Sequence, residues 1–82
     1  MIEISHLRCF VAVAEELHFG RAAARLHMTQ PPLSRQIQLL ERSLGCDLFL
    51  RTSRSVLLTE AGTSFRPEAE RILRLLENAQ NR

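Results

Sequence analysis

Apolar residues recur at helical spacing in the middle of the chain, between Met28 and Leu44. The spacing i, i+4, i+7 and i+11 places four side chains on one buried face: Leu33, Ile37, Leu40 and Leu44. Pro31 and Pro32 come first, and prolines are tolerated in a first turn whose backbone N–H groups have no helical partner. The pattern predicts a helix that begins at Gln30 or Pro31, with Thr29 as its N-cap.

The opposite face of this predicted helix is polar. At 100° per residue it carries hydrogen-bonding side chains and no carboxylate: Pro31, Ser34, Arg35, Gln38 and Arg42. Ser, Arg and Gln contact base edges and phosphates, and a helix N-terminus favours a phosphate. The helix alone leaves two interpretations open, a DNA-recognition helix and a core helix with a solvated face.

Two shorter helical patterns precede this segment. The first has Ser5 as its expected N-cap and apolar residues at helical spacing: Leu7, Phe10, Val11, Ala14 and Leu17. Residues 18–20 interrupt the pattern, and an alanine-rich helix is expected over residues 21–27. A tight turn, with His27 or a neighbour in place of the usual glycine, leads into the polar-faced helix. Two helices joined in this way predict a helix-turn-helix.

A β-hairpin is expected directly after the helix-turn-helix. Gly45 is placed to end the preceding helix, and two apolar runs, residues 47–51 and 56–58, flank the polar turn 52–55. A hairpin in this position is a wing, and Arg51 and Arg54 are expected at its tip, within reach of the DNA backbone or minor groove. The predicted fold over residues 1–58 is mainly α, a winged helix-turn-helix of three helices and a two-stranded wing.

Residues 59–82 predict a long linker helix with Thr59 as N-cap. Five apolar residues recur at alternating gaps of four and three, and we call them the heptad stripe: Phe65, Ala69, Ile72, Leu76 and Ala79. The stripe indicates dimerisation with a second copy of the chain, and the alternative is that it folds back onto its own domain. Pro67 lies inside this helix, so we expect a bend there without loss of register.

The charge is concentrated around the polar-faced helix. The chain has 82 residues and a net charge of +2, of which residues 1–19 contribute −2, residues 21–54 contribute +4 and the remainder zero. All basic residues are arginine, which suits bidentate contacts to phosphate and guanine but also follows from genome base composition. A clustered basic stretch is typical of a nucleic-acid binder.

The sequence does not indicate a metalloprotein, an enzyme or a membrane protein. The histidines His6, His18 and His27 lack metal-ligand spacing, and Cys9 and Cys46 are expected to be buried free thiols, so no metal or cofactor is expected. No paired carboxylates, nucleophile–base set or phosphate loop indicate an enzyme. No apolar run spans a bilayer and no charged-then-apolar leader opens the chain, which favours a cytoplasmic protein without membrane contact.

The ordered set of motifs resembles one family over essentially the whole chain. The motifs are Phe10-x-x-Val13-Ala14, Ala22-Ala23-x-x-Leu26, Gln30-Pro31-Pro32-Leu33-Ser34-Arg35-Gln36-Ile37, Leu40-Glu41, Leu44-Gly45, Leu48-Phe49-x-Arg51 and Leu58-Thr59-x-x-Gly62. Together they are similar to the N-terminal winged helix-turn-helix and linker helix of LysR-type transcriptional regulators. His18, where the family often has a serine cap, and Pro67 in the linker helix depart from that pattern.

The resemblance implies a bacterial transcription regulator that binds double-stranded DNA with two-fold related half-sites as a homodimer. Each recognition helix would enter a major groove and each wing a flanking minor groove. The residues that would face DNA are Thr29, Gln30, Pro31, Pro32, Ser34, Arg35 and Gln38 from the helix and Arg54 from the wing. Full-length members form higher oligomers and continue into an effector-binding domain, which we expect to be missing from this chain.

Three classes of function were compared. The leading one is a sequence-specific DNA-binding module, the second is a helical dimerisation module whose arginine face meets protein or RNA, and the third is an enzyme. Binding to a defined duplex in the presence of competitor DNA separates the first two. The operator, the target genes, activation or repression and the inducer cannot be read from these residues.

Overall fold

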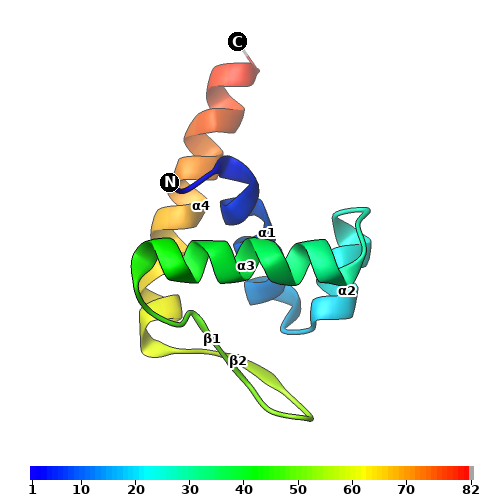
Figure 1. The fold of residues 1–82 in the computed structure, drawn as a ribbon. Coiled ribbons are helices and arrows are strands. Elements are labelled where there is room, and N and C mark those ends of the chain that lie inside the picture. Colours follow the sequence, from blue (N-terminus) through cyan, green and yellow to red (C-terminus); the bar gives the residue numbers. More distant parts are fainter. Residues whose placement is uncertain (82) are drawn as a thin grey trace.

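The computed structural model describes residues 1–81. In this part of the chain it contains four helices and one antiparallel hairpin (Figure 1). The elements are α1 (Ile4–Glu16), α2 (Phe19–Arg25), α3 (Gln30–Leu44), β1 (Phe49–Arg51), β2 (Val56–Leu58) and α4 (Glu60–Gln80). The prediction of a mainly helical fold with a two-stranded wing is confirmed.

Two helix starts differ from the prediction because histidines contribute to the caps. Helix α1 has Glu3 as N-cap, not Ser5, and the Glu3 backbone N–H donates to His6 Nδ1 at 3.0 Å. Helix α2 begins at Phe19, two residues before the predicted start. There His18 is the N-cap, and its Nδ1 accepts a hydrogen bond from the Arg21 backbone N–H at 2.9 Å. An imidazole nitrogen thus serves as the acceptor that serine or aspartate usually supplies at a helix start.

Helices α1, α2 and α3 enclose the core, together with the base of the hairpin. The side chains of Leu33, Ile37 and Leu40 are at most 2 % exposed, so the predicted buried face of α3 is confirmed for these three, whereas Leu44 is half-buried against the core. Phe10 lies at the centre, with its ring centroid 5.4 Å from that of Phe49 and 5.2 Å from that of Phe65. Such tilted pairs add to the stability gained from burying the rings.

The first half of α4 belongs to the same core. Phe65 and Leu73 pack against the buried cluster and Ala69 is 0 % exposed, so residue 58 does not mark a break in packing. Gly62 explains the close approach: a β-carbon there would overlap the Leu48 carbonyl oxygen. The helix runs without interruption through Pro67, and its second half projects away from the body toward the C-terminal end (Figure 1).

The two thiols have different environments. Cys9 is 4 % exposed and burial raises its pKa, because the thiolate is poorly solvated inside the core. Cys46 follows the αL residue Gly45 at the end of α3 and is exposed. The prediction of two buried thiols is therefore correct for Cys9 and wrong for Cys46.

Candidate nucleic-acid interface

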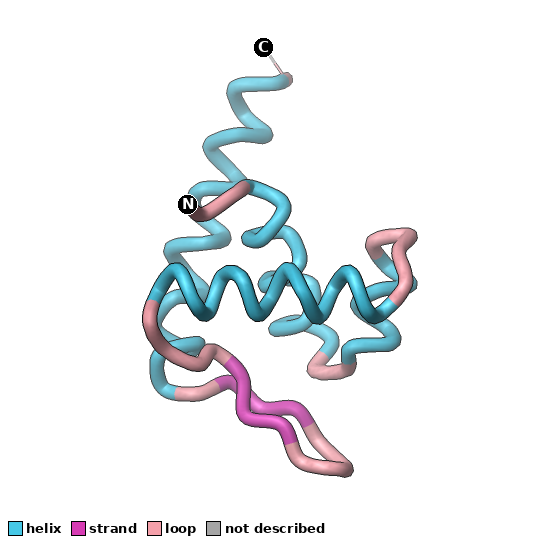
Figure 2. The backbone as a smooth tube through the Cα atoms, viewed as in Figure 1, coloured by secondary structure: helices cyan, strands magenta, loops and turns pink. Residues whose placement is uncertain are grey.

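Helix α3 lies across one side of the molecule with the hairpin beside it (Figure 2). It begins at Gln30 with Thr29 as N-cap, as predicted, but the Thr29 side chain accepts no capping hydrogen bond. Five of the predicted contact residues at its start and on its outer face are exposed: Thr29, Gln30, Pro31, Arg35 and Gln38. The other two, Pro32 and Ser34, are half-buried. The structure therefore places these seven residues on or beside one solvent-facing surface.

The turn before α3 relies on a histidine in the left-handed region. His27 has φ of 58°, a conformation that glycine usually supplies, and the Met28 N–H donates to the Ala23 carbonyl at 2.9 Å. The prediction that His27 replaces the glycine of the turn is confirmed. The turn fixes the direction in which α3 leaves the body.

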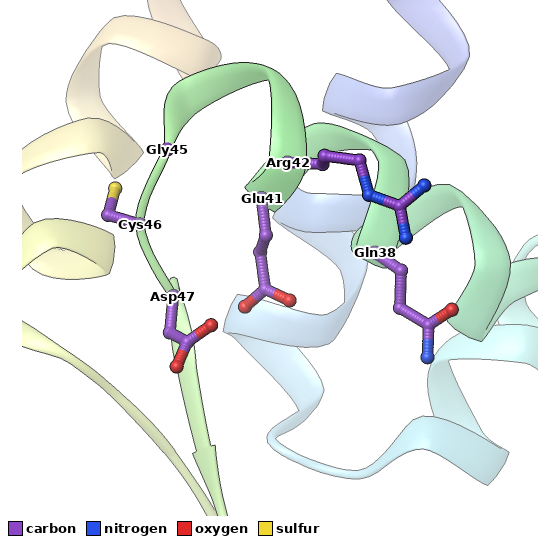
Figure 3. Close-up of a pocket in the computed structure, with 6 residues that line it drawn as sticks. All are labelled: Gln38, Glu41, Arg42, Gly45, Cys46 and Asp47. Carbon is purple, nitrogen blue, oxygen red and sulfur yellow. The ribbon is translucent and has the colours of Figure 1, made fainter.

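Glu41 joins α3 to the base of the wing. One of its carboxylate oxygens accepts hydrogen bonds from the backbone N–H groups of Leu48 at 2.7 Å and Phe49 at 3.3 Å. Glu41 also lines an open hollow of about 570 Å³ at the C-terminal end of α3. Figure 3 shows the residues around it. Arg42 lines this hollow together with Glu41 and Asp47, so charges of both signs meet there and a phosphate backbone is not favoured.

The wing tip is a compact polar turn. The Thr52 hydroxyl accepts hydrogen bonds from the backbone N–H groups of Arg54 at 3.3 Å and Ser55 at 3.0 Å. Arg54 is exposed at this tip, as predicted. A hollow of about 320 Å³ lies between Arg54, His18 and Gln30, so the structure brings the wing tip next to the start of the recognition helix.

Arg51 does not lie at the tip. It is the last residue of β1, pairs with Val56, and lies on the same face of the hairpin as the buried Phe49. Its guanidinium carbon is 3.6 Å from the centroid of the Phe19 ring, and its Nη2 donates to Ser34 Oγ at 3.5 Å. The placement of Arg51 at the tip is therefore wrong. The sequence reasoning also missed Phe19, which it assigned to a break between helices.

Ion pairs divide the arginines of the basic stretch into two groups. Arg21 pairs with Glu16 at 3.5 Å, and Arg25 pairs with Glu15 at 2.5 Å and with Glu16 at 3.5 Å. The hydrogen bond to Glu15 is the main cause of the raised pKa of Arg25. Within residues 1–81, the arginines on α3 and the wing have no carboxylate oxygen within 4 Å: Arg35, Arg42, Arg51 and Arg54. Within the basic stretch, the arginines without an ion pair therefore lie on α3 and the hairpin, and Arg42 among them lies beside the acidic Glu41 and Asp47.

The heptad stripe of α4 is divided between two environments. Phe65 is half-buried and contacts Phe10, and Ala69 is 0 % exposed, so both pack on the chain's own core and Ala69 has no surface left for a dimer contact. Ile72 is 41 % exposed, Leu76 is half-buried and Ala79 is exposed. Leu75, outside the predicted stripe, is 62 % exposed and widens the apolar surface.

Among residues 1–81, no group of three or more His, Cys, Asp or Glu side chains is placed to hold a metal ion. No helix in the described part of the chain has the length and apolar character needed to cross a membrane.

Comparison with known proteins gives a consistent set of relatives. A family model described as "Bacterial regulatory helix-turn-helix protein, lysR family" matches residues 4–63. The chain is 60 % identical over 81 residues to the uncharacterized HTH-type transcriptional regulator YnfL of Escherichia coli (strain K12), covering 99 % of this chain and 27 % of YnfL. It is 55 % identical over 76 residues to the HTH-type transcriptional regulator ClcR of Pseudomonas putida, covering 93 % of this chain and 26 % of ClcR.

Two solved structures of similar length contain DNA. One is described as a CbnR_DBD-DNA complex, with a TM-score of 0.92 and 44 % identity, covering 96 % of this chain and 91 % of that chain. The other is described as a BenM_DBD/benA site 1 DNA complex, with a TM-score of 0.90 and 47 % identity, covering 96 % and 89 %. The chain spans about a quarter of the length of the curated relatives, 27 % of YnfL and 26 % of ClcR, and nearly the whole of these two domains.

Proposed function

The chain belongs to the lysR family of bacterial regulatory helix-turn-helix proteins, and from this premise we propose that it is the sequence-specific DNA-binding module of a transcription regulator. The observation that carries the proposal is the surface formed by α3 and the wing. It combines an exposed helix face of Arg and Gln with arginines that no carboxylate compensates within residues 1–81. Similar domains whose descriptions name bound DNA support it, and relatives named as transcriptional regulators argue against an enzyme.

The outer face of α3 would read the major groove. Arg35 and Gln38 carry the donor and acceptor groups that distinguish guanine and adenine edges. Thr29, Gln30 and Ser34 would contact phosphates or bases near the start of the helix, and Pro31 and Pro32 would make apolar contacts. These seven positions remain a proposal that mutation can test one residue at a time.

The wing would lie against the backbone or the flanking minor groove. Arg54 is exposed at the tip, beside the hollow that it shares with Gln30. A cation in that position attracts phosphates or the strong negative potential of a narrow minor groove. Arg51, closer to α3, would contact the strand between the helix and the wing tip.

We propose a homodimer through the exposed part of α4, which would pair two recognition helices with two-fold related half-sites. The corrected interface consists of Ile72, Leu76 and Ala79, with Leu75 added. An isologous contact of this kind places the same residues of both copies around the symmetry axis. The relatives are about four times as long, so higher oligomers and an effector-binding part would belong to the longer protein. A role on bacterial DNA would place it in the cytoplasm.

Selection of duplexes from a random DNA pool tests this function. The 82-residue chain should enrich one motif, and a duplex that carries the motif twice in inverted orientation should bind better than one that carries it once. Binding should persist in an excess of scrambled duplex of the same composition. If no duplex is enriched, or RNA or protein competes better than the selected DNA, the interaction-module alternative replaces this proposal.

A further inference from the structure

A single guanidinium joins three elements of the interface. Arg51 comes from β1, the ring under it belongs to Phe19 of α2, and the hydroxyl that it contacts belongs to Ser34 of α3. We propose that Phe19 is a positioning residue for DNA binding: it holds Arg51 beside α3 so that helix and wing present one rigid cationic surface. The inference rests on the proposed function and assigns a role to an apolar residue that does not itself face DNA.

The ring of Phe19 is a fixed platform. It is 7 % exposed and forms an edge-to-face pair with the ring of Phe49, with a centroid distance of 6.1 Å and an interplanar angle of 72°. Its backbone position is set by the His18 cap at the start of α2. A ring held by a neighbouring ring and by its backbone keeps its orientation toward Arg51.

The position of Arg51 in the hairpin directs it toward this platform. Side chains of a strand alternate between its faces, so Arg51, although exposed, lies on the same face as the buried Phe49, while Leu50 between them is 58 % exposed on the other face. A flat guanidinium can stack on an aromatic face when no carboxylate is near. Stacking leaves the in-plane N–H donors free, and within residues 1–81 Nη2 donates to Ser34 Oγ at 3.5 Å and the others make no hydrogen bond.

Arg54 provides the contrast within the same wing. Its backbone N–H is tied to Thr52, but its side chain makes no hydrogen bond or ion pair within residues 1–81. A free arginine loses rotamer freedom when it binds a phosphate, whereas the contacts of Arg51 with Phe19 and Ser34 already restrict its rotamers. The stacked arginine should therefore contribute more to affinity than the free one for the same number of phosphate contacts.

The test measures DNA affinity and its salt dependence for Phe19→Leu, Arg51→Ala and the double variant. The probes are a duplex selected by the wild-type chain and a scrambled duplex of equal length. Arg51→Ala should weaken binding by about tenfold and reduce the salt slope by about one, as expected for one lost phosphate contact. Phe19→Leu should lose part of the affinity and of the slope, and in the double variant the leucine should add nothing to the loss caused by Arg51→Ala.

Phe10→Leu is the matched control. Phe10 belongs to the same aromatic cluster and is 0 % exposed, but its ring pairs within residues 1–81 are with Phe49 and Phe65, not with Phe19. Both leucine variants should lose stability in denaturant unfolding, and only Phe19→Leu should change the salt slope. Phe19→Tyr, which keeps the ring face, should restore the wild-type slope.

The two proposals fail in different ways. If the wild-type chain enriches no duplex, the proposed function is overturned and this inference falls with it. If the wild type binds, but Phe19→Leu keeps the wild-type slope or adds its full loss in the Arg51→Ala background, only the positioning role is overturned.

Discussion

Helices α3 and α4 carry the same kind of apolar pattern but use it differently. The apolar face of α3 is buried within the domain, and Leu33, Ile37 and Leu40 are at most 2 % exposed. The apolar face of α4 is buried only in its first half, and farther along the helix Ile72 is 41 % and Leu75 62 % exposed. One helix therefore has a polar face left for a ligand, and the other has an apolar face left for a partner.

This difference shows that amphipathic periodicity predicts a helix but not what covers its apolar face. An apolar stripe is buried by whichever surface the tertiary fold brings next to it. Helix α3 lies across the body of the domain, whereas the end of α4 extends beyond it, so similar apolar stripes are covered to different extents (Figure 1). Five substitutions test the contrast, from the largest expected effect to the smallest.

Leu40→Ala tests the buried face of α3. Leu40 is 0 % exposed, so truncation should leave a cavity and lower the free energy of unfolding by about 2–5 kcal/mol. Leu75→Ala on α4 is the control and should change the free energy of unfolding by less than about 0.5 kcal/mol. Denaturant unfolding at low protein concentration measures both, and equal losses would remove the contrast between the helices.

Leu76→Glu tests the partner face of α4. A carboxylate between two apolar helices has no partner there, so the dimer dissociation constant should rise roughly a hundredfold, about 3 kcal/mol. Asn78→Glu, which adds the same charge at an exposed position of the helix, should leave association unchanged. Sedimentation of both variants gives the mass. A monomeric wild type at high micromolar concentration, or a dimeric Leu76→Glu variant, would assign this face to the chain's own fold.

Gly62→Ala tests the docked half of α4. Helix propensity alone would make alanine more stable by about 1 kcal/mol. A β-carbon at Gly62 overlaps the Leu48 carbonyl oxygen, a backbone atom that cannot move aside cheaply, so we expect a net loss of about 1–3 kcal/mol. Thermal or denaturant unfolding decides the sign, and a gain in stability would mean that α4 shifts easily on the wing base.

Arg35→Ala tests the polar face of α3. If Arg35 contacts a guanine edge, the variant should lose about 1–3 kcal/mol on the selected duplex and less on a scrambled one. Folding should be unchanged because the side chain is exposed. Titration of both duplexes measures the difference, and unchanged affinity for the selected site would remove Arg35 from the residues that read sequence.

Arg54→Ala is the smallest of the five and separates the wing tip from the recognition helix. A phosphate contact should weaken specific and scrambled duplexes alike, by about 1 kcal/mol, and lower the salt slope by about one. The measurement is affinity over a range of salt concentrations. A loss confined to one base position, with the slope intact, would move Arg54 to the group of base-reading residues.

The sequence predicted the elements well because their signals are local. Proline in the first turn and Gly45 with φ of 74° bound α3, and Thr59 caps α4 by accepting a hydrogen bond from the Gly62 N–H at 3.0 Å. The polar face of α3 followed from its 3.6-residue period. The starts of α1 and α2 were wrong because a Glu3 cap supported by His6 and a His18 cap carry no strong propensity signal.

Partnerships between distant residues were not predictable in the same way. Arg21 and Arg25 counted toward the basic stretch, but α2 packs beside α1, where Glu15 and Glu16 neutralise them. Phe19 and Arg51 are separated by 32 positions, and only the docking of the wing brings them together. The placement of the residues proposed to face DNA on or beside the surface was predicted, whereas the contacts of Arg51 with Phe19 and Ser34 were not.

The proline pair at the start of α3 limits the kinds of contact that this end of the helix could make with DNA. Pro31 is exposed and Pro32 half-buried, and neither has an N–H, so this edge of the helix offers fewer amide protons than a helix start usually presents. Proline also has no rotamer freedom to lose. A contact through this edge would therefore cost little side-chain entropy and little desolvation of backbone N–H groups. Whatever Pro31 and Pro32 add to sequence preference must come from shape and apolar fit, as against a thymine methyl group, and not from a backbone hydrogen bond.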